Sequence, residues 1–105
     1  MPNISLIYIT HASEAEAQRI SNLLLEAHLV ACANIFPIQS AYWWQGVLEN
    51  SSEWVSIVKT TAEKWSAVQD AVVQWHPYTT PCILNLEVVA NEAYAAWIRG
   101  EVEKE

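Results

Sequence analysis

Two stretches of this chain share one pattern, in which a short apolar strand runs directly into the start of a helix. The first is the apolar run Ile4–Thr10 followed by Ser13–Glu16, and the second is Trp54–Thr60 followed by Thr60–Glu63. In both, a hydroxyl residue precedes Glu by three positions, the capping box that satisfies free N–H groups at a helix start. The repeated junction restricts a chain of 105 residues to folds with two matching halves.

The segments around these junctions complete each half. Apolar residues recur every three or four positions in both expected helices, which gives each helix one apolar face. These positions are Ala17, Ile20, Leu24 and Ala27 in the first helix, and Trp65, Val68, Val72 and Trp75 in the second. A last strand is expected over 82–89, and Asn91 caps a short terminal helix. The order β-α-β, β-α-β plus a C-terminal helix predicts an α+β, ferredoxin-like fold with an antiparallel sheet, as a single domain over residues 1–105.

The segment 29–44 is long and extended, and it contains the features expected of an edge strand. Pro37 cannot donate a hydrogen bond to a neighbouring strand, so it marks a bend, a bulge or a sheet edge. Gln45 and Gly46 begin a hairpin turn. The polar segment 49–52 is expected to precede the next strand, which is placed at 54–60.

The chain is rich in apolar residues for its length. Hydrophobic residues make up 52% of it and include six Trp. A small domain has little interior in which to bury six indole rings, and aromatic residues are enriched at subunit contacts. The sheet face without helices also needs a cover. The sequence therefore predicts an oligomer.

Charge and the N-terminal sequence exclude several classes of partner. Twelve acidic and five basic residues give a net charge of −7, so no basic face is available for nucleic acid or for an anionic membrane. Residues 1–5 lack the basic region of a signal peptide, and no apolar run is long enough to span a bilayer. We expect a cytoplasmic protein without nucleic-acid or membrane partners.

Five residues could bind a soft metal ion or carry acid–base chemistry. Cys32 and Cys82 are far apart and lack C-x-x-C spacing, which excludes zinc-ribbon and thioredoxin-type sites and favours buried, reduced thiols. His11 lies at the first strand-to-helix junction. His28 and His76 lie at the expected helix ends, where each can serve as a C-terminal cap. His76 also begins a rigid segment with two prolines, as a preorganised site requires.

Five segments are distinctive as an ordered set. They are L-V-A-C-A-N-I at 29–35, Y-W-W-Q-G at 42–46, K-T at 59–60, H-P-Y-T-T-P at 76–81 and Y-A-A-W-I at 94–98. Together they resemble the CutA family, over nearly the whole chain. The resemblance implies a ferredoxin-like fold, a tight homotrimer with strands that pair across subunits, and a link to tolerance of copper and other divalent cations. The family's trimer is similar to that of the nitrogen-regulatory PII proteins, which implies a small-ligand or signalling role in clefts between subunits.

The resemblance also implies a ligand cleft, for which the matching residues are Trp44, Lys59, His76 and Tyr78. Cys82 stands where the family usually has an acidic residue. Because thiolate and imidazole ligands suit copper, His76 and Cys82 are the candidate metal ligands. The copper positions proposed in relatives are Thr10, Ala71 and Trp75 here, so that ligand set does not transfer.

These observations predict a non-enzymatic divalent-cation (copper) tolerance protein of CutA type, with no required cofactor and with a metal ion or small metabolite as ligand. The alternative is a PII-like signalling or scaffold trimer with no direct metal role. An acylphosphatase-type enzyme on the same fold is disfavoured, because Arg19 and Arg99 lie in expected helices and no Gly-rich loop exists. A nucleophilic pair of His76 and Cys82 lacks an evident third group to orient it.

Overall fold

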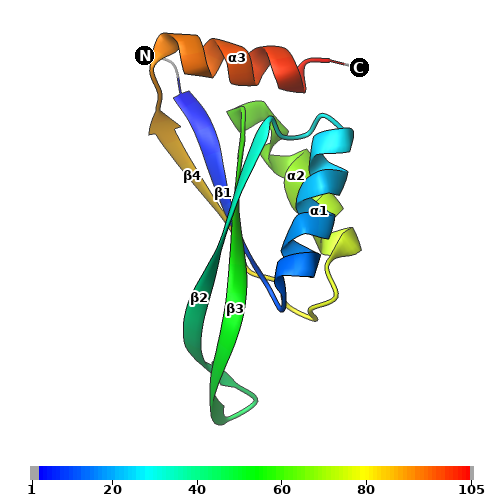
Figure 1. Cartoon of the computed structure of the whole chain (residues 1–105), viewed down its shortest axis with the longest axis vertical. Helices are drawn as coiled ribbons and strands as arrows, with labels where there is room; N and C mark the ends of the chain where they lie inside the picture. The colour runs from blue at the N-terminus through cyan, green and yellow to red at the C-terminus, as the bar shows by residue number, and fades with distance from the viewer. Residues whose placement is uncertain (1–2, 105) are drawn as a thin grey trace.

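The computed structural model describes residues 3–104 as a four-stranded sheet with three α-helices (Figure 1). In chain order the elements are β1 (Asn3–His11), α1 (Glu14–Glu26), β2 (Cys32–Trp44), β3 (Val47–Thr60), α2 (Trp65–Trp75), β4 (Ile83–Val89) and α3 (Glu92–Val102). The strand order is β2-β3-β1-β4, and every pair is antiparallel. This confirms the predicted ferredoxin-like topology.

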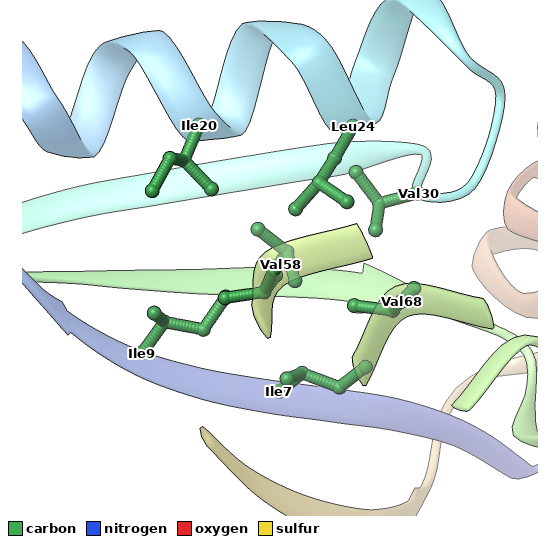
Figure 2. Close-up of a cluster of buried hydrophobic side chains, with 8 residues drawn as sticks. Ile7, Ile9, Ile20, Leu24, Val30, Val58 and Val68 are labelled. Atoms are coloured by element: carbon green, nitrogen blue, oxygen red, sulfur yellow. The ribbon is translucent and has the colours of Figure 1, made fainter. Parts of the chain in front are cut away.

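The main core lies between one face of the sheet and helices α1 and α2 (Figure 2). Successive side chains of a strand point to opposite faces, and Ile7 and Ile9 of β1 both face the helices, where they are fully buried. They pack with the apolar faces of the two helices, as the helical spacing predicts. The residues buried in this core are Ile7, Ile9, Ile20, Leu24, Val30, Val58, Val68 and Val72.

The other sheet face is covered at one end only. Helix α3 packs there through Ala95 and Ile98 on Ile4 of β1, and Figure 1 shows it crossing the end of the sheet that is opposite the β2–β3 hairpin tip. On β4, Leu84 pairs with Tyr8 and Leu86 with Leu6, so both leucines lie on this face. Their exposed fractions are 53% and 56%, which leaves an apolar face open.

Strands β2 and β3 form a long hairpin whose tip projects from the rest of the chain (Figure 1). Gln45 and Gly46 form its two-residue loop with φ values of 51° and 81°, the left-handed conformations that such a turn requires. The expected start of β3 at Trp54 is wrong, because pairing begins immediately after the turn, at Val47. Pro37 lies in β2, an edge strand, as predicted.

Of the two expected capping boxes, only the first forms its hydroxyl bond, and the Glu16 carboxylate bonds Arg19 instead of closing the box. The Ser13 hydroxyl accepts a hydrogen bond from the Glu16 backbone N–H at 3.1 Å. At the second junction the Thr60 hydroxyl donates instead to the Leu29 carbonyl at 2.7 Å, so it does not cap, and a 3₁₀ turn at Ala62–Lys64 precedes α2.

The expected end of the first helix near His28 is close to the observed one. Helix α1 ends at Glu26, and His28 has a φ of 56°. The expected capping role of the imidazole is replaced by a longer-range contact, because its Nδ1 donates to the Glu101 carbonyl at 3.1 Å. His28 therefore connects the end of α1 to α3.

Candidate functional site

His76 lies where α2 ends, and it is held by two hydrogen bonds. Its Nε2 donates to the Thr10 carbonyl of β1 at 2.7 Å, and its Nδ1 accepts from the Tyr78 backbone N–H at 3.1 Å. A carbonyl can only accept and an N–H can only donate, so the proton of the neutral ring is on Nε2. The side chain is 7% exposed, and both ring nitrogens are occupied.

His11 stacks against His76 inside the molecule. The two ring centroids are 5.3 Å apart, and the rings are 21° from parallel. His11 is fully buried, and a hydrogen bond of 2.8 Å joins its Nε2 to the Ser56 hydroxyl. Burial, and next the neighbouring His76, lower the pKa of His11 from 6.5 to about 4. His11 is therefore uncharged at neutral pH.

A groove of about 740 Å³, which we call the Tyr78 groove, lies beside this pair. It is formed by β1, β2, β3 and the connection between α2 and β4. Residues of different chemistry line it, among them Tyr8, Tyr42, Trp44, Glu53, Tyr78 and Cys82. The volume is in the range of small-molecule sites.

Tyr78 connects the two histidines to the groove. Its ring packs edge-on against His76 with centroids 4.6 Å apart, and its hydroxyl donates to Glu53 Oε2 at 2.8 Å. Burial, and next the bond to Glu53, raise the pKa of the Tyr78 phenol. Hydrogen bonds to Thr10 and Glu53 thus hold the imidazole and the phenol of the 76–81 segment next to the groove.

Cys82 lines the groove as a protonated thiol. Burial, and next the Glu53 carboxylate, raise the pKa of this thiol, and a thiol is a weaker nucleophile and metal ligand than a thiolate. Cys82 and Cys32 are both free and only half-buried, so the expectation of fully buried thiols is wrong. Neither belongs to the main core, against which their chain neighbours Ala33 and Ile83 pack.

Comparison with known proteins identifies the family. A family model described as "CutA1 divalent ion tolerance protein" matches residues 5–101. The chain belongs to this CutA family. The "Divalent-cation tolerance protein CutA" of Archaeoglobus fulgidus is 46% identical over 100 residues, covering 94% of this chain and 98% of that protein. The protein of the same name from Thermotoga maritima is 42% identical over 99 residues, covering 92% and 97%.

Solved CutA structures share the fold. The structure described as the "Periplasmic divalent cation tolerance protein CutA from Archaeoglobus fulgidus" superposes with a TM-score of 0.92 at 45% identity, covering 94% of this chain and 98% of that one. The names of these relatives refer to tolerance of divalent cations. No helix within residues 3–104 has the length and apolar character to cross a membrane. The cytoplasmic location stays a prediction.

The folded CutA chain brings together only part of the predicted ligand cleft. Trp44 and Tyr78 line the Tyr78 groove, and His76 contacts Tyr78. Lys59 does not line it. Lys59 lies opposite Leu6 in the sheet, and its Nζ donates to the Tyr94 hydroxyl at 3.3 Å. A cleft between subunits that contains all four residues stays a prediction.

The predicted metal ligands are neighbours without forming a complete centre. His76 donates to the Thr10 backbone carbonyl, and Cys82 and Thr10 line the same groove. Within residues 3–104, no three His, Cys, Asp or Glu side chains are grouped so that they could hold a metal ion. To bind one, His76 must release one of its two hydrogen bonds. The pair therefore stays a prediction.

Sequence reasoning missed one residue of this site and did not foresee the burial of another. Glu53, 8% exposed, carries the charge of the groove, yet it lies at the end of a polar stretch that gives no signal of burial. His11 is among the candidate residues, and its burial could have been predicted, because it follows Ile7 and Ile9 at every second position of β1 and so faces the same core.

Proposed function

We propose that this CutA chain acts in divalent-cation tolerance as a homotrimer that binds a small ligand or a metal ion in clefts between its subunits, and that it does so without catalysing a reaction. The observation that carries the proposal is the apolar sheet face that α3 leaves open. Leu84 and Leu86 are more than half exposed there, and burying such a surface against another copy is favourable.

The hairpin supports assembly from the other side of the molecule. Trp43 is 73% exposed near its tip, and Val47 and Leu48 are 56% and 54% exposed. Strands β2 and β4 are the edges of the sheet, where unpaired backbone groups can bond to another chain. Because the hairpin and the β4 face are different surfaces, a contact between them is head-to-tail, and such a contact closes into a ring when the rotation between copies permits it.

A matched pair of substitutions tests the assembly. Leu86 on the open face and Val73 on the outer face of α2 are both 56% exposed. We expect Leu86→Asp to reduce the light-scattering mass from three chains to one at micromolar concentration, because it places a charge in the subunit contact. We expect Val73→Asp to leave the mass unchanged. A Leu86→Asp protein that remains trimeric contradicts the proposed surface.

Direct copper binding by His76 and Cys82 is the second candidate, favoured by the position of Thr10, whose carbonyl bonds His76 and which lines the groove together with Cys82. We expect calorimetric titration with copper to weaken in His76→Ala and Cys82→Ser but not in Cys32→Ser, the other half-buried free cysteine. If all three variants bind copper as the parent does, His76 and Cys82 are not ligands.

The PII-like alternative predicts no direct binding of copper or other metal ions. A signalling or scaffold trimer with no direct metal role is stabilised by an organic ligand and not by metal ions, which a thermal-shift screen of both classes distinguishes. Cell fractionation tests the cytoplasmic location that the sequence predicts.

A further inference from the structure

The Tyr78 groove has one source of charge at neutral pH among the residues that line it. That residue is Glu53, since no Asp, Lys, Arg or His accompanies it there. The other ionisable side chains that line it are tyrosines and Cys82. The pKa of the Tyr78 phenol and that of the Cys82 thiol are both raised, so both stay neutral. The groove is therefore negative, which disfavours anionic ligands.

Glu53 is buried with only part of its hydrogen-bonding capacity used. It is 8% exposed, and its Oε2 accepts from the Tyr78 hydroxyl at 2.8 Å. Within residues 3–104 its Oε1 has no hydrogen-bond partner and is not among the fully enclosed unpartnered atoms, so it is reachable from outside, and no Lys, Arg or His forms an ion pair with Glu53. A buried carboxylate without a cation is costly. A ligand that brings an N–H donor and a positive charge offsets that cost.

The walls of the groove suit a ligand with a flat apolar body. Tyr8, Tyr42 and Trp44 supply aromatic faces, and Ile38 and Pro77 supply apolar ones. Aromatic faces attract cations as well as apolar rings.

A bare metal ion fits this groove less well than an organic cation. Divalent ions take several oxygen, nitrogen or sulfur ligands, whereas no three His, Cys, Asp or Glu side chains are grouped for this purpose within residues 3–104. One carboxylate oxygen is enough for an ammonium or amidinium group.

We propose that the Tyr78 groove binds a small organic cation, an amine or amidine on a flat apolar body, with Glu53 as the recognising carboxylate. This inference names the ligand class for the proposed function above and rests on it.

Ligands of similar shape but different charge test whether binding requires a positive charge on the ligand. Tryptamine and benzamidine are flat cations, tryptophol is the neutral counterpart of tryptamine, and indole-3-propionate is an anionic one. We expect calorimetry to detect both cations, with tryptophol about 10- to 100-fold weaker than tryptamine, as the loss of a charged hydrogen bond predicts, and no binding of indole-3-propionate. If neither cation binds at millimolar concentration, or tryptophol binds as tightly as tryptamine, the inference is overturned.

Two substitutions test whether Glu53 is the carboxylate that recognises the cation. We expect Glu53→Gln to weaken tryptamine by the same 10- to 100-fold factor, and Glu26→Gln, which removes an equal charge at an exposed position of α1, to leave it unchanged. Equal affinity in the parent and in Glu53→Gln overturns the assignment. Light scattering on the same samples distinguishes the two proposals. A trimer that binds no cation contradicts only the inference about the ligand. A monomer contradicts the proposed assembly.

Discussion

At the scale of single residues, the stacked pair of His11 and His76 determines how the fold responds to acid. His11 is enclosed by the core, with Ser56 as its only described hydrogen-bond partner. Burial and His76 lower its pKa, and they outweigh Glu16 and Glu53, which act in the opposite direction. Between these two pKa values, His11 is therefore protonated in the unfolded chain and neutral in the folded protein.

This difference predicts a pH dependence of stability. Because the pKa of His11 falls from 6.5 to about 4 on folding, the free energy of unfolding decreases as the pH falls from about 6.5 toward 4, by up to about 3 kcal/mol. We expect His11→Gln to lose that part of the slope. Urea denaturation at fixed protein concentration, at pH 7, 5.5 and 4.5, measures it, and parallel slopes for parent and variant contradict the assignment.

The contact between Tyr78 and Glu53 makes a second prediction. Removing the hydroxyl in Tyr78→Phe leaves the carboxylate short of a donor, so we expect a loss of about 1–2 kcal/mol in the free energy of unfolding. In a double-mutant cycle with Glu53→Gln, a coupling energy of about 1 kcal/mol is expected. Strictly additive losses would show that the two side chains do not interact.

These residues also mark the limit of sequence reasoning about the site. The 76–81 motif predicts a rigid segment that carries an imidazole and a phenol, and the two rings do pack against each other. It cannot predict that they reach Thr10 and Glu53, which are 66 and 25 positions away from their partners. Such contacts depend on how strands from both halves of the chain pack together. Local sequence patterns do not predict that packing.

At the scale of elements, the β2–β3 turn depends on left-handed backbone conformations. Gly46 has a φ of 81°, and a Cβ added there meets no atom within 4 Å, so only backbone strain opposes a side chain. We expect Gly46→Ala to lower the free energy of unfolding by about 1 kcal/mol.

Gly100 is the matched control for this prediction. It lies within α3, and an added Cβ there also meets no atom within 4 Å. Since Ala is the better helix former, Gly100→Ala is expected to raise stability by about 0.5–1 kcal/mol. Urea denaturation measures both variants, and a shift of both in the same direction would rule out this account of the turn.

The elements themselves follow from the sequence where the signal is local. Apolar spacing places α2 at Trp65–Trp75, and Ser13 caps α1 as its motif predicts. The two local predictions that fail, the second helix cap and the start of β3, fail for one reason. Residues distant in the sequence offer these segments other hydrogen-bond partners. Thr60 is engaged by Leu29 instead of capping, and the polar residues 49–52 join β3 because β2 offers them a paired strand.

At the scale of the whole molecule, the single chain is more extended than its length requires. Its radius of gyration is 14.3 Å, against about 13 Å for a compact chain of this length. The projecting hairpin and the open β4 face account for the difference. The apolar composition and the six Trp predict association, but the register of subunit contacts depends on shapes that no single-chain pattern specifies.

The mass of the native protein in solution tests the central claim that identical copies complete the open sheet. Static light scattering from micromolar down to nanomolar concentration is expected to give three times the 11.9 kDa mass of one chain throughout. A mass of one chain at micromolar concentration would contradict the account.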